Sequence, residues 1–421
     1  MIGLPMRICF CLVLAVLSLT TRGLVHAGEN WPEFRGPTAD GRSDSTGLPT
    51  TWSETENIAW KTPIPGKGWS SPVIWGKQVW LTTATEDGHT LTAYCLDRDT
   101  GAVIHELPVF TVEKPAYIDP FNSYASPTPA IEEGRVYLSW GSSGLACVDT
   151  ATGATLWERR DLPCEHYRGA GSSPILHGEL LFLHYDGFDF QYVVALNKQT
   201  GQTVWKTDRP KDFGTDNGDT KKAFATPIVI TVNGQEQLIS PTSKGMFGYN
   251  VQTGAEIWRV TYDPFSTPAR PLYHDGVLIF SGGFSKGVLF AVRADGQGDV
   301  TATHIVWKEE KSMPSKPSPL LIDGLVYTIE DQGVAMCLEE KTGQTVWKSR
   351  LGGNYSASPV YADGKLYFLS HEGKVSVVAP GREFHELAEN NLPEGFIASP
   401  AIAGKALYLR TKKAVYRVEA K

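Results

Sequence analysis

The sequence predicts an all-β fold: an eight-bladed β-propeller of four-stranded antiparallel blades, with the ring closed by an N-terminal strand that completes the C-terminal blade. Three observations support this prediction. The chain repeats itself, each repeat shows the same order of short strands and turns, and one strand near the N-terminus has no partner within its own neighbourhood. A repeat of about 40 to 50 residues is typical of propeller blades.

The repeat is marked by a Ser-Pro, Thr-Pro or Arg-Pro pair followed by apolar residues. Eight such pairs occur at a mean spacing of about 47 residues, which fits one four-stranded blade per repeat. The pairs begin at Ser71, Ser126, Ser173, Thr226, Arg270, Ser318, Ser358 and Ser399.

Within a repeat, short runs of β-forming residues alternate with turns that contain glycine. Residues 358–384 show this pattern clearly, with turns at Gly364, Gly373 and Gly381. Glycine supplies the positive φ that tight hairpins require, so four runs joined in this way predict one antiparallel blade. Tryptophans at or near the start of the fourth run are expected to stack between blades, with the indole N–H bonded to a partner. These are Trp60, Trp157, Trp205, Trp258, Trp307 and Trp347.

The eighth repeat ends before it can form a fourth strand. Residues 57–61, which include Trp60, have the character of a fourth strand and are expected to pair with the C-terminal blade. That pairing removes two exposed sheet edges. The predicted organisation is a signal peptide at 1–27, an irregular strap at 28–56 on the propeller exterior, and the propeller at 57–421.

The N-terminus has the layout of a secretory signal, with Arg7, an apolar run over 8–19, and a cleavage point after Ala27. The run is shorter than the roughly 20 residues of a spanning helix. We therefore expect an exported, periplasmic or secreted monomer without a transmembrane segment. The 46 acidic residues outnumber the 39 basic ones, which disfavours binding to nucleic acid.

Four cysteines lie outside the predicted signal. Cys95, Cys147 and Cys337 occupy equivalent positions in different repeats and are expected to be unpaired core residues, because equivalent positions are too far apart for a disulfide. The redox state of Cys164 is left open. It begins a polar cluster, residues 164–168, which is expected to face the loop 184–189. The spacing matches no established metal site, so none is predicted.

The segment from Cys337 to Trp347, CLEEKTGQTVW, and its counterpart from Ala195 to Trp205, ALNKQTGQTVW, resemble the PQQ-like propeller repeat. The resemblance extends from about Asn57 to the C-terminus. Such repeats occur in quinoprotein dehydrogenases, in the outer membrane protein assembly factor and in exported proteins of unknown role, so the resemblance implies a fold more than a function.

The quinoprotein dehydrogenases hold PQQ and calcium in the propeller centre, and many carry a disulfide between adjacent cysteines. This sequence has no adjacent cysteine pair, and the family's Asp base and calcium-binding Glu and Asn have no matching positions. No catalytic residue and no cofactor are therefore expected, with PQQ and calcium kept as an alternative.

The loops that lead into the first strands are expected to share one face and to gather aromatic and cationic side chains at the channel mouth. The candidate ligand- or partner-binding residues are Trp69, Tyr124, Arg168, Lys222, Arg270, Lys316, Tyr355, Phe121, His166 and Asp186. The favoured function is a non-catalytic scaffold that binds protein or peptide partners in the cell envelope, as resemblance to the assembly factor implies. The alternatives are a small-ligand or PQQ-binding propeller and a PQQ-dependent oxidoreductase.

Overall fold

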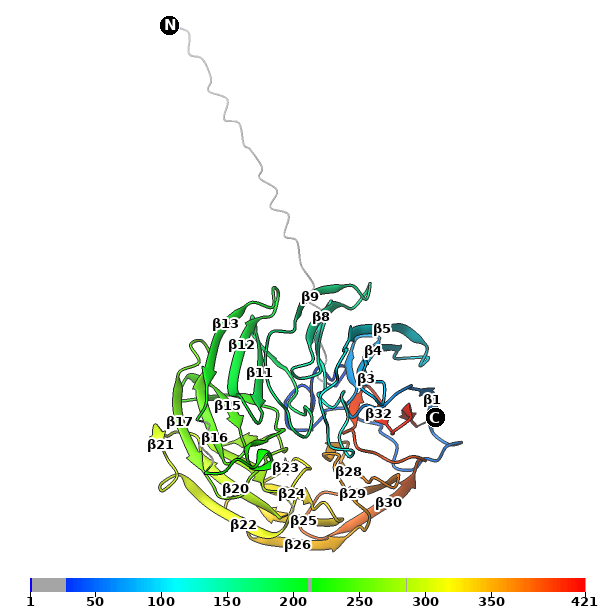
Figure 1. The fold of residues 1–421 in the computed structure, drawn as a ribbon. Coiled ribbons are helices and arrows are strands. Elements are labelled where there is room, and N and C mark those ends of the chain that lie inside the picture. Colours follow the sequence, from blue (N-terminus) through cyan, green and yellow to red (C-terminus); the bar gives the residue numbers. More distant parts are fainter. Residues whose placement is uncertain (2–27, 211–213, 285, 421) are drawn as a thin grey trace.

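The computed structural model describes residues 1, 28–210, 214–284 and 286–420, and it shows eight sheets arranged around a central axis in chain order (Figure 1). The predicted eight-bladed, all-β propeller is confirmed. The one helix within the described residues is a short 3₁₀ turn, η1 (Gly218–Lys221). The predicted signal peptide falls on residues 2–27, outside the described part of the chain.

Each blade is an antiparallel sheet whose first strand lies nearest the axis. The strands of the first four blades are β2 (Val73–Trp75), β3 (Gln78–Ala84), β4 (Thr90–Asp97) and β5 (Val103–Thr111); β6 (Ala130–Glu132), β7 (Arg135–Ser139), β8 (Leu145–Asp149) and β9 (Thr155–Arg159); β10 (Ile175–His177), β11 (Leu180–Asp186), β12 (Gln191–Asn197) and β13 (Thr203–Asp208); and β14 (Ile228–Val232), β15 (Gln235–Pro241), β16 (Gly245–Asn250) and β17 (Glu256–Thr261).

The fifth blade contains β18 (Leu272–His274), β19 (Val277–Gly282), β20 (Gly287–Arg293) and β22 (Ile305–Met313). The sixth contains β23 (Leu320–Ile322), β24 (Leu325–Ile329), β25 (Val334–Glu339) and β26 (Thr345–Arg350), and the seventh contains β27 (Val360–Ala362), β28 (Lys365–Leu369), β29 (Lys374–Ala379) and β30 (His385–Asn391). The eighth is made of β31 (Ala401–Ala403), β32 (Ala406–Arg410), β33 (Ala414–Glu419) and β1 (Ile58–Pro63).

The second and third strands of each blade are almost fully buried, whereas the outermost strand exposes alternate side chains. β3 and β12 are buried along nearly their whole length, because neighbouring blades cover both faces. β5 instead alternates in its exposure, as an edge strand with one solvated face does. The cores therefore form between blades as well as within them.

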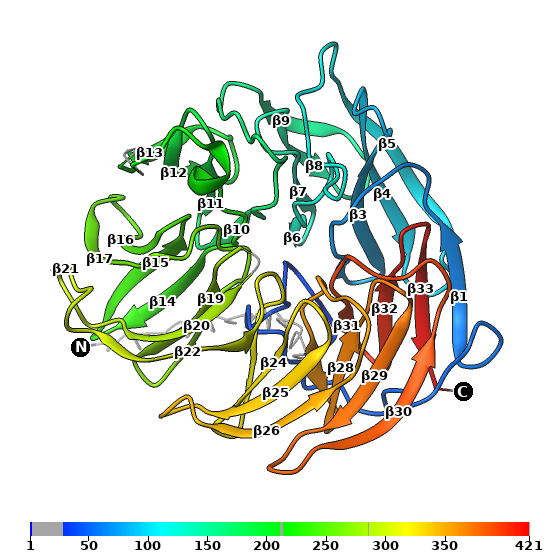
Figure 2. The ribbon, with the colours of Figure 1, turned by 60° about the horizontal axis from the view of Figure 1, so that its bottom comes forward.

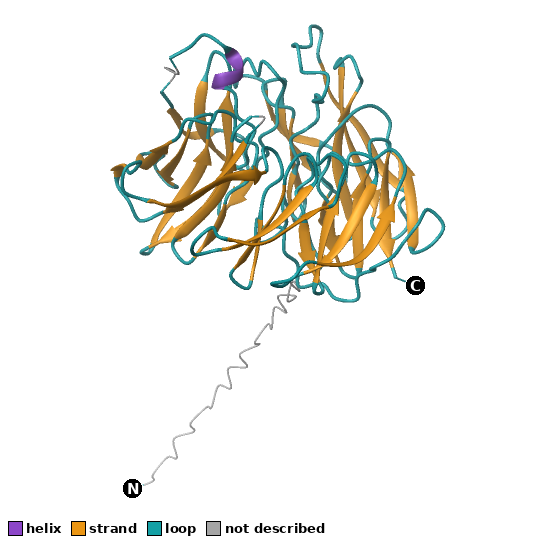
Figure 3. Cartoon of the chain, turned by 90° about the horizontal axis from the view of Figure 1, so that it is seen from below, coloured by secondary structure: helices purple, strands orange, loops and turns teal. Residues whose placement is uncertain are grey.

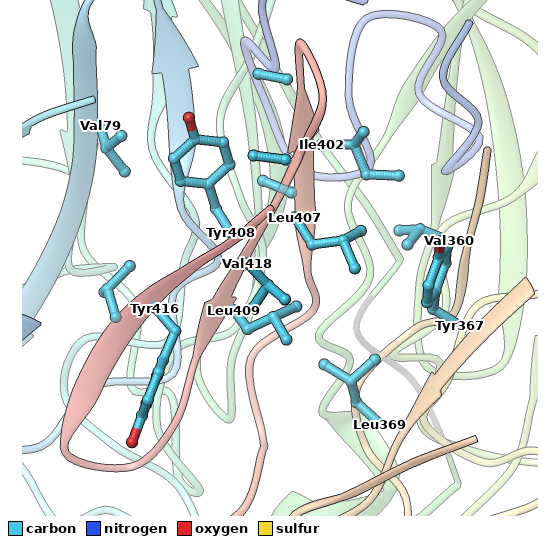
Figure 4. Close-up of a cluster of buried hydrophobic side chains, with 14 of the residues drawn as sticks. Val79, Val360, Tyr367, Leu369, Ile402, Leu407, Tyr408, Leu409, Tyr416 and Val418 are labelled. Atoms are coloured by element: carbon cyan, nitrogen blue, oxygen red, sulfur yellow. The ribbon is translucent and has the colours of Figure 1, made fainter. Parts of the chain in front are cut away.

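The ring closes as the sequence predicts. β1 pairs antiparallel with β33, with Lys61 opposite Tyr416, and Figure 2 shows the two strands side by side. The joint is sealed by a large cluster of buried apolar side chains from the first, seventh and eighth blades. Figure 4 shows Val79 of β3, Tyr408 of β32 and Val360 of β27 within it. The two ends of the propeller are thus joined by both backbone pairing and packing.

Five of the six predicted tryptophans bond to the next blade. The indole nitrogen of Trp60 donates to the carbonyl of Arg98 at 3.0 Å, and the equivalent bonds join Trp157 to Lys198, Trp205 to Val251, Trp307 to Glu340 and Trp347 to Gly381. The rings also cover the glycine of the Thr-Gly turn. A Cβ at Gly101, whose φ is +74°, would lie 2.6 Å from the Trp60 ring, so this turn needs glycine for both its backbone and its neighbour.

Trp258 differs, because it bonds within its own blade, to Gln237 at 2.8 Å. The following blade lacks the regular Thr-Gly turn at this position. A short strand from that blade, β21 (Gly298–Asp299), instead pairs in parallel with β17 and gives the fourth sheet a fifth strand. Its indole N–H has the expected hydrogen-bond partner, but that partner lies in the same blade rather than in the next one. Its ring nevertheless lies in the apolar cluster that the fourth and fifth blades share.

The second repeat begins two residues later than the sequence suggested. β6 starts at Ala130 and pairs with Tyr137, just as Val73 pairs with Trp80 in the first blade. Thr128-Pro129, rather than Ser126-Pro127, is therefore the equivalent of Ser71-Pro72. Cys95, Cys147 and Cys337 are free and buried, as expected for core residues, and Cys164, whose state the sequence left open, is free and buried as well.

The strap, residues 28–56, does not pack on the exterior as predicted, because part of it lies inside the ring. Trp31 exchanges backbone hydrogen bonds with Ile74 on the inner strand β2, and Ser43 donates to Tyr361 on β27. Arg35 is 1% exposed between these contacts. The unpaired inner edges of short first strands provide the backbone partners that hold the strap there.

Candidate functional site

The loops that lead into the first strands surround one end of the central channel, which we call the mouth. Figure 3 shows the ring from the side, with η1 among the loops at this end. A cavity of about 600 Å³ opens there. A volume of 300 to 1,000 Å³ is usual for ligand pockets, roughly that of a small molecule or a few peptide side chains.

The cavity has a polar floor made by a ring of hydroxyl groups, one from nearly every blade. The hydroxyl ring consists of Ser71, Thr128, Ser173, Thr226, Ser318, Ser358 and Ser399. Each hydroxyl accepts a hydrogen bond from the backbone N–H of the equivalent residue in the preceding blade, as Thr128 does from Ser71 at 2.9 Å and Ser71 does from Ser399 at 3.1 Å. Seven such links are made. The recurring Ser-Pro and Thr-Pro pairs therefore join the blades around the axis.

The eighth link is missing because the fifth blade has Arg270 where the others have a hydroxyl. Its buried side chain turns to the strap and donates to the carbonyl of Phe34 and, at 2.8 Å, to the carboxylate of Glu33. Arg35 of the strap completes the connection by donating to the carbonyls of Pro359 at 3.0 Å and Pro319 at 2.6 Å. The strap thus closes the channel on the side of the hydroxyl ring away from the mouth.

The wall above this floor is contributed equally by all blades. In every blade, the residue two positions before the hydroxyl-ring position lines the cavity. These eight residues are Trp69, Ser126, Gly171, Phe224, Pro268, Lys316, Ser356 and Ile397. Phe34 of the strap and the loop residues Phe121, Phe265 and Phe284 add further aromatic surface.

Arg168 joins two long loops across the mouth. Its guanidinium contacts Asp119 at 2.6 Å in the loop after the first blade, and Asp219 of η1 at 2.6 and 2.8 Å. The hydrogen bonds from Arg168 lower the pKa of Asp219, so the aspartate remains charged in the pair. Lys316 is likewise paired, with Asp331. These two cations are therefore already neutralised by carboxylates.

Lys222, which follows η1, lies in a different environment. It is 2% exposed, and its Nζ lies 2.9 Å from the carbonyl oxygen of Asp186 and 3.3 Å from His166 Nδ1. The carboxylate of Asp186 points to Arg209 instead, at 3.0 Å. Burial lowers the pKa of Lys222, and burial together with Lys222 lowers the pKa of His166 well below its usual 6.5.

The structure brings five of the ten predicted site residues to the cavity: Trp69, Phe121, Arg168, Lys222 and Lys316. The other five do not line it. His166 and Asp186 lie behind Lys222, and Arg270 holds the strap. Tyr355 is fully buried, whereas Tyr124 packs beside Gly88 and donates to the carbonyl of Ala116. The predicted contact between residues 164–168 and the loop 184–189 is present, as Glu165 N–H donates to Asp189 at 2.7 Å.

Several wall residues were not predicted, among them Phe34, Phe224, Phe265 and Phe284. Phe224 could have been predicted from the sequence, because it occupies the same repeat position as Trp69 and Lys316 when the repeats are aligned on the hydroxyl ring. Phe34 carried no such signal, because it reaches the wall only through the strap. Within the described residues, no group of three or more His, Cys, Asp or Glu side chains could hold a metal ion. Nor does that part of the chain contain a helix long and apolar enough to cross a membrane.

Comparison with known proteins agrees with this architecture. The chain is 23% identical to the outer membrane protein assembly factor BamB of Shewanella oneidensis over 246 residues, which is 53% of this chain and 56% of that protein. Across three such assembly factors, the chain spans 50 to 63% of their length.

Two solved structures share the fold at 12% sequence identity. BamB from Moraxella catarrhalis aligns with a TM-score of 0.59 over 86% of this chain and 99% of that one. A europium-containing methanol dehydrogenase aligns with a TM-score of 0.66 over 90% and 89%. The family described as outer membrane protein assembly factor BamB matches residues 43–160, 127–349 and 189–421, which together span the whole propeller, and the chain therefore belongs to this family.

Proposed function

We propose that this protein is an exported, non-catalytic propeller that binds a protein or peptide partner at its mouth during outer membrane protein assembly. The observation that carries the proposal is the group of large aromatic side chains exposed on the mouth loops. Tyr117 is 64% exposed, Phe121 46%, Phe188 37% and Phe284 63%. Exposed aromatic side chains gathered around a concavity are typical of protein-binding surfaces.

The charges of the mouth favour a neutral or apolar segment of the partner. Arg168 and Lys316 are paired with carboxylates, so neither offers a free positive charge to an acidic ligand. The aromatic wall offers area for an inserted apolar side chain, and the hydroxyl ring offers hydrogen-bond acceptors and donors at the floor. This surface supports a binding mode in which an apolar side chain of the partner enters the cavity and the rim contacts the surrounding segment.

Family membership supports the same partner class. The relatives are named as outer membrane protein assembly factors. A partner belonging to that process also agrees with export through the predicted signal peptide. The proposal therefore names the class of partner, which is the outer membrane proteins or the machinery that assembles them.

Site-specific photo-crosslinking in intact cells tests the proposal. A photoreactive residue replaces Phe284 or Phe121 at the mouth, and a matched control replaces Val306, which is 49% exposed on the outer strand β22. The mouth positions should crosslink to outer membrane proteins or their assembly machinery, and Val306 should not. Equal crosslinking from Val306, or products unrelated to assembly, would refute the proposal.

A second candidate is a propeller that binds a small ligand in the cavity, which its volume of about 600 Å³ favours. The paired cations of the wall disfavour PQQ itself. That quinone carries three carboxylates, whereas Arg168 and Lys316 already face Asp119, Asp219 and Asp331, which leaves Lys222 as a single partner without a carboxylate among the described residues. Titration with PQQ and calcium, followed by quinone absorbance and dye-linked alcohol oxidation, separates the candidates. Saturable turnover would favour an oxidoreductase.

A further inference from the structure

Lys222 is the cavity-lining cation that has no carboxylate partner among the described residues. Arg168 and Lys316 both form ion pairs, whereas the Lys222 amine contacts the carbonyl of Asp186 and the ring of His166. The amine also lies 4.7 Å from the centre of the Phe224 ring, which lines the cavity beside it. Burying an ammonium without a counter-charge is costly, so the hydrogen bonds around it decide its state.

The protonation of His166 follows from its neighbours. The backbone N–H of Ser142 donates to His166 Nε2 at 3.0 Å, so this nitrogen carries no proton and the neutral ring has its proton on Nδ1. Nδ1 faces the Lys222 amine at 3.3 Å and Cys164 Sγ at 3.6 Å. An ammonium has no lone pair, so a charged Lys222 would place two donors against each other.

An uncharged amine resolves this conflict. Its lone pair accepts the hydrogen bond from Nδ1–H, and one of its own hydrogens is donated to the Asp186 carbonyl. The other titratable groups around it are Cys164, His184, and the pair of Asp186 with Arg209. The negative charge of Asp186 acts to raise the pKa of Lys222, but its carboxylate bonds to Arg209 and not to the amine, and burial has the larger, opposite effect.

We propose that Lys222 is a covalent capture site for small apolar or aromatic aldehydes that enter the cavity. The nitrogen lone pair forms a bond to the carbonyl carbon, and the carbonyl electron pair moves to oxygen. The two amine protons then leave with that oxygen as water, and an imine remains. No oxidant or reductant is needed. This inference does not depend on partner binding.

His166 and Cys164 give the amine a way to act. When Nδ1–H turns fully to Cys164 Sγ, the Lys222 lone pair is released for attack, and the same N–H can then donate to the imine nitrogen. The Phe224 ring beside the amine provides a face for an aromatic aldehyde.

Reductive trapping tests this proposal. The full mature chain is incubated with benzaldehyde and sodium cyanoborohydride at pH 7, and benzylated lysines are quantified by peptide mass spectrometry. Lys316 is the internal control, because it lines the same cavity but is paired with Asp331. We expect Lys222 to be modified about tenfold faster than Lys316 or more, as suits an amine that is uncharged at this pH. The Lys222→Arg variant should lose that peptide's label.

The pH profile supplies a second readout. The trapping rate at Lys222, divided by the rate for free Nα-acetyllysine in the same mixture, should fall from pH 7 to 10, because the free ammonium loses its proton over that range and the Lys222 amine does not. The proposal is overturned if Lys222 is unlabelled, if it reacts no faster than Lys316, or if the ratio of its rate to that of Nα-acetyllysine does not change with pH.

Discussion

The indole nitrogen of Trp60 lies 3.0 Å from the carbonyl oxygen of Arg98, across the joint between the eighth and first blades. Trp60 is on β1, so this bond and the packing of its ring help to close the propeller. Trp60→Ala should reduce the free energy of unfolding by about 3 to 5 kcal/mol, as for other buried aromatic truncations. Trp60→Phe, which keeps most of the packing, should cost about 1 kcal/mol. Urea titration followed by circular dichroism measures both, and equal effects would contradict this account.

Arg35 should be needed to hold the strap in the channel. Its guanidinium donates to the carbonyls of Pro319, Pro359 and Asp40 in a buried site. Arg35→Met removes these donors and leaves buried acceptors unpaired, with an expected loss of about 2 kcal/mol or more. Limited proteolysis should then cut within residues 28–56 faster than in the wild type. Arg42→Met, which removes an exposed contact with Asp40, is the matched control and should not change the cleavage rate.

Arg168 should order the two mouth loops that it joins. Arg168→Met leaves Asp119 and Asp219 without their shared partner. The double variant Arg168→Met with Tyr124→Phe also removes the hydrogen bond from the Tyr124 hydroxyl to the Ala116 carbonyl. Hydrogen exchange should accelerate around 112–124 and 215–221, while the blades remain protected. Unchanged exchange in both loops would show that other contacts hold them.

His184 should make the protein less stable as the solution becomes acidic. Burial lowers the pKa of His184 from 6.5 to about 4, and its neutral ring bonds to Ser240 and Ala225. Between these two values the unfolded chain binds a proton that the folded chain does not, so stability falls as pH decreases from about 6.5 to about 4. The full effect is about 3 kcal/mol. His184→Gln should flatten this slope in urea titrations taken at several pH values; a slope equal to that of the wild type would assign it to other groups.

Phe284 should contribute to partner binding without supporting the fold, because its ring is 63% exposed and its one ring contact among the described residues is with Phe265. Phe284→Ala should weaken the affinity for the partner that photo-crosslinking identifies by about tenfold, a usual effect for an aromatic contact residue. Binding of the purified partner by calorimetry measures this change. Val306→Ala, on an outer strand, should bind like the wild type.

The blade pattern was predictable because it is written locally in each repeat. The Thr-Gly turns and the tryptophans recur at fixed offsets, and Trp60 identified the closing strand even though it is over 350 residues from β33. The start of the second blade was misread because Ser126-Pro127 and Thr128-Pro129 have the same local signature. The pairing of Ala130 with Tyr137 and the hydrogen bond from the Ser71 N–H to the Thr128 hydroxyl distinguish them.

The cavity wall was harder to predict, since it depends on contacts between distant segments. The partners of Arg168 lie 49 and 51 residues away, in loops with no repeat counterpart, so the acids that neutralise it had no sequence signature. The strap is held by backbone hydrogen bonds and by Arg35, which donates to the backbone carbonyls of Pro319 and Pro359. Backbone carbonyls are present at every position, so they leave no signature in the sequence. Its place in the channel was therefore not encoded in a recognisable motif.

Because the strap closes one end of the channel, the propeller has a cavity with a single opening instead of an open channel. A bound molecule must enter and leave this cavity by the same opening, so an extended polypeptide cannot pass through the ring from one side to the other. A partner can insert only a terminus, a loop or a side chain, and the depth of that insertion is limited by Phe34 and the hydroxyl ring. For the proposed partner, this geometry means that one part enters the cavity while the rest remains outside it.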